Sequence, residues 1–141
     1  MRILGIDYGD RKVGLAVSDP LQITAQALDN YRLIDNNQDR DYFQKLVKEL
    51  NITKIVLGLP LRMDGTSGPR VDKTKAFAQW LKGFLDVPIV YWDERLTTKQ
   101  AITILNSQKI KAKAKKKLED QIAAVLILSS YLEGQRHKSS E

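Results

Sequence analysis

Two positions of this sequence carry acidic residues that could take part in a chemical reaction. Asp7 ends the short apolar run RILGIDY, whose neighbours indicate a strand buried on both faces. An ionised carboxylate at such a place needs a cation or hydrogen-bond donors to offset its desolvation. The pair Asp93 and Glu94 follows a second apolar run that ends at Trp92. Neighbouring residues of an extended chain point to opposite faces, so only one of the two is expected to join Asp7, and the spacing does not choose between them.

A third acid, Asp120, falls in the first turns of the predicted last helix. Ala123, Ala124 and Ile127 follow it at helical spacing, which puts the carboxylate over an apolar stripe expected to face the sheet. The alternative is a purely structural role, in which an acid near a helix N-terminus only complements the helix dipole. Asp7 has a similar alternative, as an acceptor for the backbone of the turn that follows it.

Three carboxylates that converge would make an oxygen-rich site for Mg²⁺ or Mn²⁺. Two such ions, roughly 4 Å apart, can activate water and stabilise the leaving oxygen of a phosphodiester displacement. The chain has no Cys, which excludes thiolate chemistry, Cys-ligated zinc and disulfides. Its one His, His137, lies in a polar C-terminal stretch, so we expect the chemistry to depend on carboxylates, hydroxyls, Lys or Arg.

The basic residues suit a polyanionic substrate. Lys and Arg number 23 against 17 Asp and Glu, for a net charge of +6. Each basic side chain near the acids could neutralise a backbone phosphate. We assign this role to Arg11, Lys12, Arg62, Arg70, Arg95, Lys113, Lys115 and Lys116. The alternatives are a solvated Lys-rich loop and, for Arg95, simple neutralisation of Asp93.

The elements that must position these residues read as three strands, then alternating helices and strands. The predicted strands are a hairpin over 2–8 and 12–18, a weaker strand within 24–33, and strands over 54–59 and 88–92. The predicted helices span 37–50, with Asp35 or Asn36 as N-cap, then 71–85, then Thr97 or Thr98 to Leu105, and finally 117–132. A Lys-rich connector over 106–116 precedes the last helix. This order predicts an α/β fold with a mixed five-stranded sheet flanked by helices.

We expect one domain over 1–135 and a disordered tail over 136–141. The longest apolar run, Ile122–Leu128, is far shorter than the roughly 20 residues of a membrane span, and no signal peptide is visible. We therefore expect a cytoplasmic protein with no membrane partner.

Four separated motifs resemble the YqgF (RuvX) family. They are GIDYG at 5–9 with KVGLAVSD at 12–19, GLPL at 58–61 with DG at 64–65 and GPR at 68–70, DERLT at 93–97, and Asp120 with Ala123, Ala124 and Tyr131-Leu132. The resemblance covers almost the whole chain. It implies a ribonuclease-H-like fold and an acidic triad of Asp7, Glu94 and Asp120, which favours Glu94 over Asp93.

The resemblance also implies a function. Members of the family are described as nucleases that mature the 5′ end of pre-16S rRNA, and their similarity to resolvases has suggested cleavage of Holliday junctions. We therefore expect a metal-dependent endonuclease of pre-rRNA, with branched DNA as the alternative substrate. A monomer or weak homodimer is expected, and junction resolution would require the two-fold dimer.

Two functions of other classes stay open. An acid followed by Gly on the first hairpin also occurs in ATP-binding proteins of the actin and sugar-kinase type, although those close two lobes over the nucleotide. The other is a non-cleaving RNA-binding module of ribosome assembly, in which the acids are structural.

Overall fold

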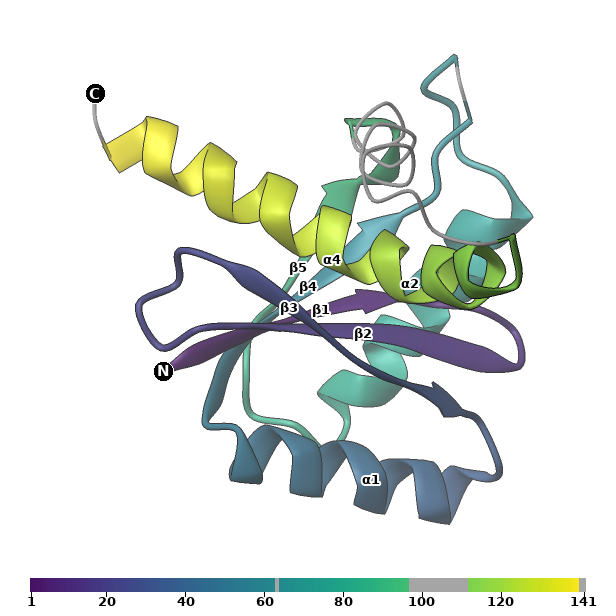
Figure 1. The fold of residues 1–141 in the computed structure, drawn as a ribbon. Coiled ribbons are helices and arrows are strands. Elements are labelled where there is room, and N and C mark those ends of the chain that lie inside the picture. The colour runs from purple at the N-terminus through teal and green to yellow at the C-terminus, as the bar shows by residue number, and fades with distance from the viewer. Residues whose placement is uncertain (63, 97–111, 140–141) are drawn as a thin grey trace.

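A five-stranded mixed sheet forms the centre of the molecule in the computed structural model (Figure 1). The structure describes residues 1–62, 64–96 and 112–139, with the side chains of 1–62, 64–95 and 122–135. The strands are β1 (Arg2–Asp7), β2 (Lys12–Ser18), β3 (Ala25–Arg32), β4 (Ile52–Leu59) and β5 (Ile89–Asp93), in the order β3-β2-β1-β4-β5. β1, β2 and β3 pair antiparallel, whereas β4 and β5 join parallel to β1. The predicted fold class is confirmed.

The first two helices each begin at a residue type that favours the start of a helix. α1 (Asn36–Glu49) has Asp35 as its N-cap, and the Asp35 carboxylate accepts a hydrogen bond of 2.8 Å from the Gln38 backbone N–H. α2 (Pro69–Lys82) begins with Pro69, whose fixed φ suits the first helical turn. A 3₁₀ turn, η1 (Glu94–Leu96), follows β5 directly. The helix expected from Thr97 or Thr98 to Leu105 lies outside the described residues.

The last helix is longer than predicted. α4 spans Ala112–Ser139, so the connector expected over 106–116 is wrong for its last five residues, and the helix passes the expected end at Leu132. The physical reason is that Ala and Lys are both strong helix formers, so the alternating run from Ala112 extends the helix instead of interrupting it. Asp120 therefore lies in the third turn of α4 and not in the first turns, which removes the helix-dipole explanation for this acid.

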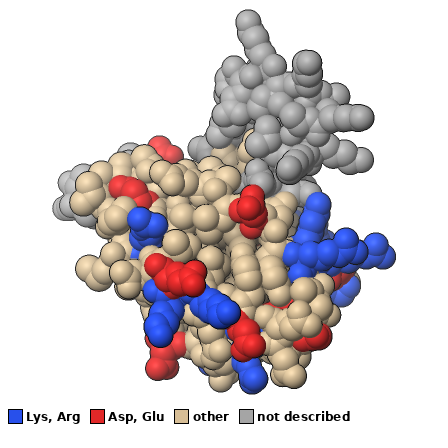
Figure 2. All heavy atoms as spheres, turned by 60° about the horizontal axis from the view of Figure 1, so that its bottom comes forward, with Lys and Arg blue, Asp and Glu red and all other residues tan. Residues whose placement is uncertain are grey.

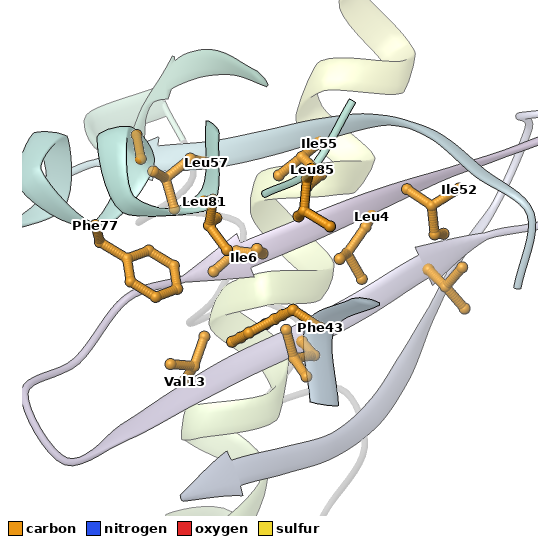
Figure 3. Packing of buried hydrophobic residues seen from close by; sticks show 13 residues of the cluster. Leu4, Ile6, Val13, Phe43, Ile52, Ile55, Leu57, Phe77, Leu81 and Leu85 are labelled. Atoms are coloured by element: carbon orange, nitrogen blue, oxygen red, sulfur yellow. The ribbon is translucent and has the colours of Figure 1, made fainter. Parts of the chain in front are cut away.

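Two apolar layers cover the two faces of the sheet. On one face, Leu4 and Ile6 of β1 pack with Phe43 of α1 and with Phe77 and Leu81 of α2 (Figure 3). The opposite face carries a second layer made with α4, formed by Ile3, Ala16, Val56, Ala124, Ile127, Leu128, Tyr131 and Leu132. Because side chains of a strand alternate between faces, the odd residues of β1, which end with Asp7, point to the α4 side.

Close packing sets the direction of α4 across the sheet. A Cβ added at Gly5 would lie 2.8 Å from Leu128 Cβ and 3.2 Å from the Ala124 carbonyl oxygen, so only glycine admits the helix at this depth. Tyr131 accepts a hydrogen bond of 2.9 Å from Lys54, near the start of β4, whereas Ile127 packs against Gly58 near its end. α4 thus runs antiparallel to β4, and its N-terminal turns extend towards the edge where β1, β4 and β5 end. Within the described residues, no helix has both the length and the apolar character that a membrane crossing needs.

Candidate active site

Asp7 and Glu94 lie side by side at the edge where the three parallel strands end. Asp7 is the last residue of β1, and Glu94 follows β5 directly. β4 lies between these strands, and its Gly58 leaves open the space that the Glu94 side chain crosses. A Cβ at Gly58 would come within 2.7 Å of Glu94 Oε1 and 3.0 Å of Glu94 Cγ. Carboxyl ends of parallel strands are where open α/β sheets place their ligand sites.

Asp7 and Glu94 are two carboxyl groups that share a partly buried environment. Burial raises the pKa of Glu94 to about 8, and the Asp7 charge and a hydrogen bond with the Asp7 carboxyl act in the same direction. The positive charge of Arg70 opposes this rise of the Glu94 pKa. Without a further cation, one proton therefore stays between the two carboxyl groups near neutral pH.

Asp93 has a different partner. Its carboxylate accepts hydrogen bonds from Arg95 Nε at 3.1 Å and from Arg95 Nη2 at 2.7 Å, a two-point ion pair. The hydrogen bond from Arg95 holds the pKa of Asp93 below its usual range. The structure therefore directs Glu94, and not Asp93, towards Asp7. It also gives Arg95 the neutralising role that the sequence left open beside phosphate binding.

The third acid, Asp120, belongs to the stretch of α4 that extends towards this edge. It precedes Ile127, which packs against Gly58, by seven residues, or roughly 10 Å of helix. The backbone of Asp120 thus lies on the face and at the end of the sheet where Asp7 and Glu94 meet. The side chain of Asp120 lies outside the described residues. Among the side chains that the structure does describe, no three acids gather closely enough to hold a metal ion.

A pocket of about 230 Å³ opens beside Asp7 on the side away from Glu94. Its lining includes Arg11, Lys12 and Arg70, three of the residues predicted to bind nucleic acid, together with Asn30. Figure 2 shows Lys and Arg side chains gathered at the right of the view, the side on which Figure 1 places the β1–β2 turn and the start of α2. The described lining of the pocket thus combines two acids, Asp7 and Asp10, with these three basic residues.

Of the other predicted basic residues, Arg62 and Arg95 are not among the described residues that line this pocket. Arg62 belongs to the loop between β4 and α2, where its guanidinium packs against Gly68. Lys113, Lys115 and Lys116 are on the first turns of α4 and not in a loop, and their side chains lie outside the described residues. Sequence reasoning missed Asn30, because a lone Asn in a weak strand carries no motif. It also missed Gly58 as the residue that makes room for Glu94.

Solved structures with this arrangement identify the class of fold. Thermus thermophilus RuvC in complex with a Holliday junction aligns with a TM-score of 0.54 and 15% identity, over 90% of this chain and 91% of that one. The fowlpox virus Holliday junction resolvase aligns with a TM-score of 0.54 and 18% identity, over 95% and 99% of the two chains. The chain thus has the ribonuclease-H-like fold of these resolvases.

The family follows from sequence. A model of the RuvX family, described as Holliday junction resolvase, matches residues 1–134, and the chain belongs to this family. A relative from Syntrophomonas wolfei is 44% identical over 134 residues, 95% of each chain. Another from Halalkalibacterium halodurans is 44% identical over 140 residues, 98% of this chain and 100% of the relative. Both relatives carry the name "Putative pre-16S rRNA nuclease". The resemblance noted from the motifs is confirmed.

Proposed function

We propose that this chain is a divalent-metal-dependent endonuclease that cleaves phosphodiester bonds in structured nucleic acid, and that it acts in the cytoplasm in 5′-end processing of pre-16S rRNA. The observation that carries the proposal is the contact between Asp7 and Glu94, next to a pocket that Arg11, Lys12 and Arg70 line. The names of the two relatives support the substrate.

The acids fit a hard divalent cation such as Mg²⁺ or Mn²⁺. Two adjacent carboxyl groups that repel each other supply oxygen ligands, and a cation between them relieves the repulsion that raises the Glu94 pKa. Asp7, Glu94 and Asp120 would hold the metal, with two ions as the proposed number. When bound, the metal would supply an activated water and charge stabilisation for the leaving oxygen.

The remaining residues of the site would bind and orient the strand. Arg70 is close enough to Glu94 to affect its pKa, so a phosphate held by Arg70 would lie beside the acid pair. Arg11 and Lys12, which line the same pocket, would hold phosphates on one side of that position. Gly58 keeps the Glu94 carboxyl free of a neighbouring Cβ and so preserves its placement.

The test is cleavage of a pre-16S rRNA 5′-leader fragment with Mg²⁺ or Mn²⁺. Asp7→Asn and Glu94→Gln should each lower the rate at least 100-fold, and EDTA should abolish wild-type cleavage. Asp41→Asn changes an exposed acid on α1, across the sheet from the site, and should cleave like wild type. Full activity of either site variant would overturn the proposal.

Junction cleavage is the second candidate, because the family model carries the description Holliday junction resolvase. It requires two opposed sites and hence a two-fold dimer. A synthetic four-way DNA junction cut at symmetric positions by a dimer, with no cleavage of the rRNA fragment, would favour it. Binding of the rRNA fragment with no turnover under any metal would favour the non-cleaving module, and Mg²⁺-dependent ATP binding by titration calorimetry would favour the kinase-like alternative.

A further inference from the structure

Asn30, which lines the pocket beside Asp7, has a buried acceptor atom without a hydrogen-bond partner. Its Oδ1 atom is buried and accepts no hydrogen bond, which makes it the one such side-chain atom among the described residues. Buried polar atoms nearly always have a partner, and an exception in a native site points to a ligand or a functional constraint. The residue also lines the pocket that contains Asp7 and Arg70.

The strand pairing places Asn30 and Asp7 on opposite sides of Gly14. Asp7 pairs with Gly14 of β2, and the β2–β3 register shifts between the Val13–Tyr31 and Leu15–Leu28 pairs, so that Asp29 and Asn30 of β3 both lie opposite Gly14. Strands lie about 5 Å apart, so Asp7 and Asn30 are about 10 Å apart at their backbones. Gly14 has no side chain to fill the space between them, and the pocket occupies it.

The basic residues of this pocket indicate which part of a nucleic acid would enter it. Arg11, Lys12 and Arg70 are suited to phosphates, so the sugar–phosphate backbone and not a base edge would lie along these walls. Phosphodiester oxygens only accept hydrogen bonds, and an acceptor such as Asn30 Oδ1 cannot bind them. Inside a strand, the donor that a sugar–phosphate backbone offers is the ribose 2′-hydroxyl, which DNA lacks.

We infer that Asn30 is a specificity-determining residue that accepts a hydrogen bond from a ribose 2′-hydroxyl next to the scissile phosphate, and so selects RNA over DNA. This inference rests on the proposed function, whose substrate class it narrows. A deoxyribose at that position would leave Oδ1 unpaired, at a cost that corresponds to a roughly tenfold weaker complex.

The experiment measures binding without turnover. Fluorescence anisotropy in EDTA compares a labelled RNA hairpin with a single-stranded 5′ extension and its all-deoxy counterpart. The wild type should bind the RNA about tenfold more tightly than the DNA. Asn30→Leu, which removes the acceptor at similar size, should bring the ratio of the two affinities close to one. Asn30→Asp keeps an acceptor but adds a negative charge, so it should weaken both affinities and keep the ratio.

Asn37→Leu, an exposed position on α1, is the matched control and should leave the ratio unchanged. The melting temperature of Asn30→Leu should equal or exceed that of the wild type, because the change removes an unpaired buried acceptor. A merely structural Asn30 would instead lower it on substitution.

Several results would overturn the inference. A wild type without RNA preference, or an Asn30→Leu variant that keeps the preference, would do so. Equal losses of RNA and DNA affinity in Asn30→Leu would also do so, because they would mean a phosphate contact through Nδ2–H. So would an RNA preference that needs metal. Failure of the proposed function is a separate result: no cleavage of the rRNA fragment with Mg²⁺ or Mn²⁺, while the Asn30-dependent preference persists.

Discussion

Replacing Glu94 by Gln should stabilise the metal-free protein, and the gain should grow with pH. The folded state raises the pKa of Glu94 from 4.5 to about 8, chiefly through burial and then through Asp7. Between these two values the folded protein keeps a proton that the unfolded chain releases. Unfolding then releases a proton, so the contribution of this residue to the free energy of unfolding becomes less favourable as pH rises from about 4.5 to about 8.

The magnitude follows from the same values. Each pKa unit between the folded and unfolded states corresponds to about 1.4 kcal/mol, which sets an upper value of about 3 kcal/mol at pH 7. Glu94 is only partly buried, so solvent screens part of this, and we expect about 2 kcal/mol. Gln keeps the shape and the neutral charge of the protonated acid. Glu94→Gln should therefore be about 2 kcal/mol more stable than wild type near pH 7 and nearly equal to it near pH 4.

Urea unfolding in EDTA at a series of pH values measures this difference directly. In thermal unfolding, it corresponds to a rise of roughly 6 °C in melting temperature near pH 7. Asp41→Asn, at the exposed α1 position, should show no such pH-dependent gain. A Glu94→Gln variant less stable than wild type near pH 8, or a difference that does not change with pH, would refute the reasoning about the acid pair.

Two further predictions concern the neighbours of this pair. Gly58→Ala should lower the free energy of unfolding by about 2 kcal/mol and slow cleavage. The reason is that the new Cβ would collide with Ile127 Cδ1 and lie 2.7 Å from Glu94 Oε1. Unchanged stability in urea would contradict the packing described. Arg70→Gln should weaken RNA binding and lower the slope of log K against log salt by about one, as expected for one lost phosphate contact, whereas Lys45→Gln on α1 should leave the slope at the wild-type value. A slope for Arg70→Gln equal to that of wild type would remove Arg70 from the interface.

Much of the fold follows from local sequence patterns. The hairpin of β1 and β2 is visible because two apolar runs flank a short turn segment, and β2 spans 12–18 as predicted. The start of α1 is visible because Asp35 offers its side chain to the first turn. The start of α4 was misjudged, because a Lys-rich run indicates a solvated segment as readily as a helix, and composition does not separate the two.

The sequence by itself determined that a carboxylate would end a buried central strand, that further acids would follow another strand and enter the last helix, and that the partner would be a polyanion. These are local properties of residue type, spacing and charge. Residue spacing did not separate Glu94 from Asp93, because both acids have the same local context, and the family resemblance only favoured Glu94. The tertiary structure decided that Glu94 turns to Asp7 while Asp93 binds Arg95. It alone placed Gly14 between Asp7 and Asn30, because strand register depends on pairing between segments distant in the chain.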